Sequence, residues 1–158
     1  MTETHTPPDD PLLFRFFNEV GIIEQLSRSA FERVLPDGLK ISQFSVLNHF
    51  ARLGGERSPA ALARAFQVTK GAMTNTLQRL EARGLVTVRP DPRDGRGKLV
   101  TITPEGRRVR DRCIAATVPM AADLRARFGD AAFGDALPFL AEVRSYLDAA
   151  RDAPEADP

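Results

Sequence analysis

Residues 58–89, SPAALARAFQVTKGAMTNTLQRLEARGLVTVR, decide the fold of this 158-residue chain, because they place two short helical patterns directly before a strand-like run. Ser58 and Pro59 are typical of the N-cap and first residue of one helix, and Thr69 can cap the next. Gly84 is suited to end that second helix. Together with a short helix predicted just before them, over residues 42–53, these helices and their brief joins predict a helix-turn-helix.

A β-hairpin is predicted directly after these helices. The runs LVTVR (85–89) and KLVTI (98–102) are strand-like because they are rich in β-branched residues. Between them, PDPRDGRG (90–97) is predicted to be a charged loop at the hairpin tip, since it is too polar for a core. The fold class is therefore α+β and mainly helical, with a winged helix-turn-helix lobe.

Two further helices are predicted on the N-terminal side. Residues 12–35 form one of about 24 residues, because their apolar side chains recur mostly at spacings of three and four. Its apolar surface is wider than one stripe, so it needs partners on more than one side, and a second copy of the chain is the expected extra partner. The second helix is expected to have its cap at Ser42 and to end at Gly54.

Helical spacing resumes after the hairpin, where Thr103 and Pro104 are suited to open a helix. The helix is expected to bend or locally break at Pro119, because proline removes a backbone donor and clashes with the preceding turn. A last helix is expected from about Asp135 to Ala150, with Pro138 in its first turn.

Composition excludes several classes of protein. Hydrophobic residues make up 42 % of the chain and charged residues 27 %, as in an ordinary globular protein. No apolar run approaches the roughly 20 residues that a membrane span requires, and the first residues do not resemble a secretory signal, so a cytoplasmic protein without a membrane partner is expected. The polar ends, residues 1–11 and 151–158, are expected to be disordered tails.

The chain offers few groups for catalysis or metal binding. Its two histidines are His5, in the expected tail, and His49, within an apolar helix. The only cysteine, Cys113, lies on the inward stripe of its helix and is expected to be a buried structural thiol. No cofactor, metal or catalytic site is therefore predicted, and a small enzyme with a cryptic site is the weaker alternative.

Positive charge gathers between residues 69 and 112, where eleven basic side chains stand against five acidic ones although the whole chain carries only +1. In the helix after Thr69, the face opposite Met73, Leu77 and Leu80 is polar and has no acid in its first two turns. It carries Gly71, Asn75, Gln78 and Ala82, with Thr74 and Arg79 at its margins. Such a face suits base edges in the DNA major groove, where asparagine and glutamine can pair with adenine.

Charges in the loop refine this hypothesis. Asp91, Arg93, Asp94 and Arg96 alternate acid and base, so an aspartate can orient an arginine through a charge-assisted hydrogen bond. An arginine held in this way at a hairpin tip can enter a minor groove. The alternative is a solvated turn with incidental ion pairs.

These residues together resemble the MarR family of winged-helix transcription regulators. The family's wing pattern is D-x-R-D-x-R, then a strand and T-x-x-G; it stands here as Asp91, Arg93, Asp94, Arg96, Val100, Thr103 and Gly106. Residues 62–86 look like the family's helix-turn-helix, and the resemblance extends over about residues 12–150.

The resemblance implies a homodimer that binds a pseudo-palindromic operator in double-stranded DNA as a repressor. Residues 12–35 and 104–150 are then the dimerisation helices, and residues 42–103 the DNA-binding lobe. The implied DNA contacts are Thr69, Lys70, Gly71, Thr74, Asn75, Gln78, Arg79, Arg93, Asp94, Arg96 and Lys98. A small aromatic or anionic effector is implied in a pocket bordered by the first, second and fifth helices, with Arg15 and His49 as candidate lining residues. The competing hypothesis is a winged-helix module that binds another protein without sequence-specific DNA binding.

Overall fold

The computed structural model describes residues 10–152 of the chain. Most of the two expected tails, and His5 with them, lie outside the described residues. The expected tail at residue 151 is wrong in its first two residues, since the last helix continues to Asp152. The chain divides between Thr117 and Val118 into two compact units.

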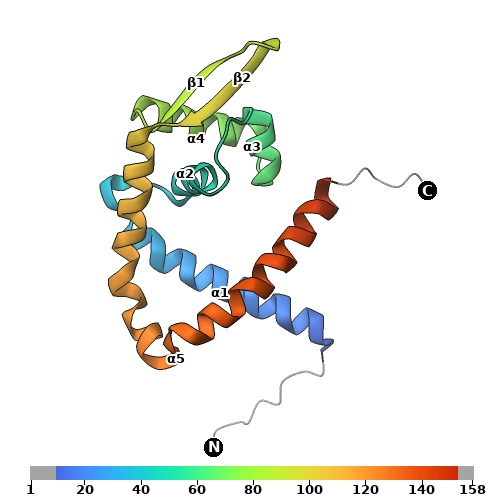
Figure 1. The fold of residues 1–158 in the computed structure, drawn as a ribbon, viewed down its shortest axis with the longest axis vertical. Helices are drawn as coiled ribbons and strands as arrows, with labels where there is room; N and C mark the ends of the chain where they lie inside the picture. The colour runs from blue at the N-terminus through green and yellow to red at the C-terminus, as the bar shows by residue number, and fades with distance from the viewer. Residues whose placement is uncertain (1–9, 153–158) are drawn as a thin grey trace, which may run out of the picture. The chain divides into compact units, whose positions relative to one another are not determined.

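The first unit holds the winged helix-turn-helix, and its elements follow the predicted order (Figure 1). They are α1 (Leu12–Val34), the 3-10 turn η1 (Pro36–Gly38), α2 (Ile41–Leu53), α3 (Pro59–Ala65), α4 (Lys70–Ala82), β1 (Val86–Asp91), β2 (Asp94–Ile102) and the beginning of α5 (Pro104–Asp152). The predicted mainly helical α+β class is confirmed. Within residues 10–152, no helix is long and apolar enough to span a membrane.

The predicted caps of α3 and α4 are confirmed. The Ser58 hydroxyl accepts a hydrogen bond from the backbone N–H of Ala61 at 3.1 Å, and the Thr69 hydroxyl accepts one from Ala72 at the same distance. Each bond satisfies one of the backbone donors that a helix leaves unpaired at its start. The connection from the end of α3 to Thr69 comprises only residues 66–68, so it fixes where α4 begins.

The predicted cap of α2 at Ser42 is wrong. The helix begins one residue earlier, at Ile41, with Lys40 as its N-cap. The Gln43 side-chain oxygen accepts a hydrogen bond from the Lys40 backbone N–H at 3.0 Å, so a glutamine in the first turn supplies the acceptor in place of the serine. The predicted end at Gly54 is confirmed by that residue's position as C-cap.

The hairpin is longer than predicted. Residues 90–97 do not form a loop over their whole length, because β1 continues to Asp91 and β2 begins at Asp94. The pairing register shifts between Pro90 and Asp91, and such an irregularity accommodates a proline that has no N–H to donate. Only two residues, Pro92 and Arg93, are left for the turn.

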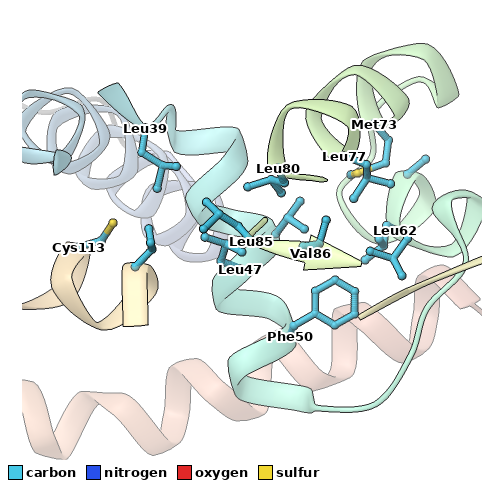
Figure 2. Close-up of a cluster of buried hydrophobic side chains, with 14 residues drawn as sticks. Leu39, Leu47, Phe50, Leu62, Met73, Leu77, Leu80, Leu85, Val86 and Cys113 are labelled. Carbon is cyan, nitrogen blue, oxygen red and sulfur yellow. The ribbon is translucent and has the colours of Figure 1, made fainter. Parts of the chain in front are cut away.

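One apolar core fills this lobe, and α2 lies at its centre (Figure 2). Val46, Leu47 and Phe50 of α2 are almost fully buried. The other members are Leu39, Leu62, Ala63, Met73, Leu77, Leu80, Leu85, Val86, Val100, Val109 and Cys113. The predicted burial of Cys113 is confirmed, and this burial raises the pKa of its thiol.

The predicted local break of α5 at Pro119 is wrong, since Pro119 lies inside the helix. The α5 backbone leaves helical dihedral angles at Gly129, where φ is 76° and ψ is 156°. Glycine adopts this positive φ without a Cβ penalty, whereas a proline costs the helix one hydrogen bond and leaves φ in the helical range. The last helical segment therefore starts directly after Gly129 rather than at Asp135, and Pro138 lies inside it.

Apolar side chains remain exposed in both units. Helix α1 contains no buried residue. Its exposed apolar side chains are Leu12, Leu13, Phe14, Phe17, Val20, Ile22, Ile23 and Leu26. In the second unit the corresponding residues are Val118, Met120, Leu124, Phe128, Phe133, Leu137, Phe139, Leu140, Tyr146 and Leu147. A monomer in water seldom leaves so many large apolar side chains uncovered.

The start of α5 is attached to the base of the hairpin. The Thr103 hydroxyl donates to the backbone oxygen of Gly84 at 2.7 Å and accepts from the N–H of Gly106 at 3.0 Å. A Cβ atom on Gly106 would overlap the backbone oxygen of Leu85 and lie 2.8 Å from Cγ1 of Ile102. Only glycine fits this position, which explains the last residue of the T-x-x-G pattern.

Replacement of Gly106 by alanine is expected to lower the free energy of unfolding by about 1 to 3 kcal/mol, because the added methyl group overpacks the junction. Urea unfolding followed by circular dichroism, at one fixed protein concentration, measures the change. Gly95→Ala is the matched control, since a Cβ there has no atom within 4 Å, and its effect should stay within about 0.5 kcal/mol. Equal effects of the two variants would contradict the packing described for Gly106.

Candidate nucleic-acid interface

The outer face of α4 is polar and open to solvent. Met73, Leu77 and Leu80 point into the core, as predicted. The candidate residues of this helix and its cap are all exposed: Thr69, Lys70, Gly71, Thr74, Asn75, Gln78 and Arg79. The burial pattern therefore leaves one whole side of α4 available to a partner.

Two of these side chains are joined to each other. The Arg79 Nε–H donates a hydrogen bond to Oδ1 of Asn75, with a nitrogen-to-oxygen distance of 3.1 Å. The residues are four apart and therefore lie one above the other on the helix surface. The spacing of four permits this pairing, but nothing else in the sequence indicates that it forms.

At the hairpin tip, both aspartates accept hydrogen bonds from the backbone. Asp91 accepts from the N–H of Arg93 at 2.9 Å, and Asp94 accepts from the N–H of Arg96 at 3.1 Å. An aspartate beside an arginine side chain is found at Asp91, whose Oδ1 lies 3.6 Å from Nε of Arg93. Asp94 instead bonds the Arg96 backbone, not the Arg96 guanidinium that it was expected to support. An aspartate in a tight turn reaches the amide two residues onward more easily than it reaches the end of a long side chain.

Helix and hairpin face a shared groove. A cavity of about 410 Å³ is lined by Ser58, Pro59, Ala60, Lys70, Thr74, Asp94, Arg96, Gly97 and Lys98. It brings together two candidate residues of α4 (Lys70 and Thr74) and three of the hairpin. An adjoining cavity adds Gln78 beside Thr74 and Lys98, whereas Asn75, Arg79 and Arg93 line neither. The beginning of α3, which contributes Ser58 and Pro59, was not among the predicted site residues.

The hairpin is braced against the segment before α3. The Arg89 guanidinium binds both carboxylate oxygens of Glu56, at 2.6 and 2.7 Å. Next to this pair, Arg57 exchanges backbone hydrogen bonds with Val100 of β2. Because the paired residues lie 33 positions apart, no local sequence pattern indicates the brace. Both side chains are partly exposed, so the pair stabilises the fold by only about 0.2 to 1 kcal/mol, and its main effect is to neutralise Arg89.

Several arginines at the start of α5 are also engaged. Arg108 donates to a Glu105 carboxylate oxygen at 2.8 Å, and Arg112 lies 3.6 Å from the other. The hydrogen bond from Arg108 holds the pKa of Glu105 below its usual value. Arg110 donates twice to the side-chain oxygen of Asn48 in α2. These contacts use the cations locally, so much of the basic block is unavailable to a partner.

Within residues 10–152, the two candidate effector residues have different surroundings. Arg15 borders a cavity whose other lining residues all lie between Asp10 and Glu19. The His49 ring instead packs against Phe66, with ring centres 5.4 Å apart. A separate cavity of about 360 Å³ is bordered by α1, α2 and α4 rather than by α5. Its lining residues are Arg28, Ser42, Ser45, Val46, Phe66, Val68, Ala72, Met73, Asn75 and Thr76.

A polar helix face beside a hairpin, built on a helix-turn-helix core, defines a winged helix-turn-helix protein. The model of the MarR family matches residues 37–97. The transcriptional activatory protein BadR of Rhodopseudomonas palustris is 34 % identical over 100 residues, which are 62 % of this chain and 55 % of BadR. The transcriptional regulator HosA of Escherichia coli is 32 % identical over 104 residues, 66 % of this chain and 73 % of HosA. The chain therefore belongs to the MarR family, whose members are transcription regulators and not enzymes.

Solved structures agree with this assignment. The crystal structure of a cysteine-to-serine mutant of MarR from Escherichia coli has a TM-score of 0.70 and 25 % sequence identity, and the match covers 85 % of this chain and 96 % of that one. The same mutant has been crystallised in complex with operator DNA. The winged-helix fold is thus confirmed.

Proposed function

We propose that this protein regulates transcription by binding duplex DNA with the outer face of α4 and the tip of the hairpin. One observation carries the proposal: Lys70 and Thr74 of α4 meet Arg96 and Lys98 of β2 in one groove, beside the exposed polar face of the helix. Cations at the rim suit phosphates, and the polar face suits base edges. Residues 42–103 are then the DNA-binding lobe.

Helix and hairpin have different roles in this proposal. Helix α4 enters the major groove, where Gln78 and Asn75 face bases and the backbone at Thr69 and Gly71 approaches phosphate. Arg93 and Arg96 extend from the hairpin tip toward the adjacent minor groove, and Lys98 faces the sugar-phosphate backbone of the DNA. Asp94 holds the turn through its bond to the Arg96 amide.

The binding species in the proposal is a homodimer. Its support is the uncovered apolar surface of α1 and of residues 118–147, which a second copy can bury. Residues 12–35 and 104–150 are therefore assigned to dimerisation. A dimer with two-fold symmetry places its lobes on half-sites about one helical turn apart, and the operator is correspondingly palindromic.

Variants in α4 and in the hairpin are expected to change DNA binding in different ways. Gln78→Ala should weaken binding to a selected operator by about 1 to 3 kcal/mol and leave a random duplex of equal length almost unaffected. Arg96→Ala should weaken binding to both and reduce the slope of log affinity against log salt by about 0.9, as for one lost phosphate contact. Equilibrium titrations at several salt concentrations measure both effects, and light scattering should give two chains per duplex.

Asp94 supplies the control within the hairpin. Asp94→Ala should reproduce part of the Arg96→Ala loss because the turn loses its acceptor, whereas Asp94→Asn keeps an acceptor and should bind DNA at least as tightly as the original protein. An unchanged Arg96→Ala slope together with tighter binding by Asp94→Ala would contradict a DNA-binding role of the hairpin. Absence of affinity for any duplex would favour the alternative, a module that binds another protein.

Repression follows from a dimer that occupies the operator and excludes other proteins from it. BadR is named as an activator, so the position of the operator within the promoter decides whether the bound protein represses or activates transcription.

The proposal includes a small aromatic or anionic effector. The cavity beside α4 is suited to it because the cavity joins the Arg28 cation to apolar side chains and also contains Asn75.

An aromatic carboxylic acid that occupies this cavity is expected to reduce operator affinity by about 5- to 150-fold, the usual range of coupling between two sites. Operator titrations with and without compounds from a panel of such acids measure this change. Arg28→Ala should abolish the effect and leave operator affinity unchanged without a compound. Compounds that bind the original protein but do not change its operator affinity would contradict an effector role.

A further inference from the structure

We propose that Arg79 sets the base preference of Asn75, so that this pair reads guanine rather than adenine in the major groove. The inference rests on the proposed function and specifies which base the α4 face recognises. It also replaces the expectation from the sequence that Asn75 pairs with adenine.

The geometry of the pair determines which way the amide faces. Arginine has only N–H donors, so the Asn75 side chain must turn its oxygen toward Arg79, as the 3.1 Å distance from Nε to Oδ1 shows. The NH₂ group of Asn75 consequently faces away from Arg79. Both residues are exposed on the side of α4 opposite the core. The groups that the pair presents outward are the Asn75 NH₂ and the terminal nitrogens of Arg79, all of them donors.

Guanine and adenine differ in the hydrogen-bonding groups that they present to this array of donors. Guanine presents two acceptors in the major groove, N7 and O6, whereas adenine presents the acceptor N7 and the donor N6. An asparagine pairs with adenine through both amide groups only if its oxygen accepts from N6. In Asn75 that oxygen already accepts from Arg79 and is turned toward it, which leaves one lone pair that points away from the outward-facing donors. The array therefore suits the two acceptors of guanine better than the adenine amino group.

Binding to DNA strengthens this constraint. In water the bond between two exposed side chains is weak, since either group can turn to solvent. Against DNA, separation of the pair would require a new acceptor for the Arg79 Nε–H, from a base or a bridging water, because an unsatisfied donor at an interface is costly. The orientation seen in the free protein is therefore the one expected against DNA.

Gln78 provides a comparison on the same helix face. It is also an exposed amide, but within residues 10–152 the structure gives its side chain no arginine partner. Its oxygen and its NH₂ group both remain available, so it can pair with adenine through both. Two chemically similar side chains are thus expected to read different bases because only one of them is oriented by an arginine.

Selection from a library of randomised duplexes tests the inference, with the original protein and the variants Asn75→Ala, Arg79→Ala and Gln78→Ala. The base position whose preference disappears in Asn75→Ala identifies the contact of Asn75. At that position the original protein should favour guanine over adenine by about 10-fold, as for one good paired contact. In Arg79→Ala the freed amide should favour adenine there. Gln78→Ala should leave this position unchanged and lose an adenine elsewhere.

The possible outcomes distinguish the inference about Asn75 and Arg79 from the proposed DNA-binding function. Adenine at the Asn75 position in the original protein, or an unchanged guanine preference in Arg79→Ala, would overturn the inference while leaving DNA recognition by α4 intact. If no sequence is enriched by the original protein, the proposed function itself fails. Circular dichroism of the three variants, whose replaced side chains are all exposed, should match that of the original protein and so exclude misfolding as the cause.

Discussion

The junction of Thr103 and Gly106 is the constraint on which the arrangement of the lobe depends. One threonine hydroxyl joins Gly84, two residues after the end of α4, to the first turn of α5. The missing Cβ of Gly106 lets α5 start against the backbone of Leu85. The Thr103 N–H also donates to the Leu85 oxygen. Because α4 ends and β1 begins at this point, the same contacts set how the hairpin leaves the helix that we propose reads DNA.

Net charge along the chain overstates the surface available to DNA. Arg89 is neutralised by Glu56, and α5 arginines are paired with Glu105 or hydrogen-bonded within the lobe. Lys70, Arg96 and Lys98 instead line the groove between α4 and the hairpin. The site is therefore defined less by the number of cations than by which of them form no ion pair within residues 10–152, although Asp94 lines the same groove. The pair of Arg89 with Glu56 also joins the hairpin to the segment before α3.

Local signals in the sequence predicted most of the lobe. Ser58 and Thr69 act as caps through their own first turns, and the inward face of α4 follows from helical spacing, so neighbouring residues suffice for both. Errors arose where two local signals compete. In the first turn of α2, Gln43 rather than Ser42 supplies the side-chain acceptor. In α5 the helical backbone is interrupted at Gly129 rather than at Pro119, because a positive φ changes the chain direction more than one missing hydrogen bond does.

Contacts between distant residues could not be predicted in the same way. The Glu56 brace and the groove that joins α3 to the hairpin depend on how β2 packs, which no local pattern specifies. The pairing of Asn75 with Arg79 is local, yet the spacing alone permits it without requiring it. Sequence and structure therefore agree on which side of α4 is exposed, whereas the chemical groups that this side offers become evident only from the side-chain geometry.

The central claim is that the outer face of α4 and the hairpin tip form the DNA-binding surface. Mapping of backbone amide chemical shifts by nuclear magnetic resonance, with and without a selected duplex, tests it most directly. The account predicts that the largest changes lie in residues 69–82 and 91–98. Changes centred on α1 or on residues 118–152, with residues 69–98 unaffected, would contradict it.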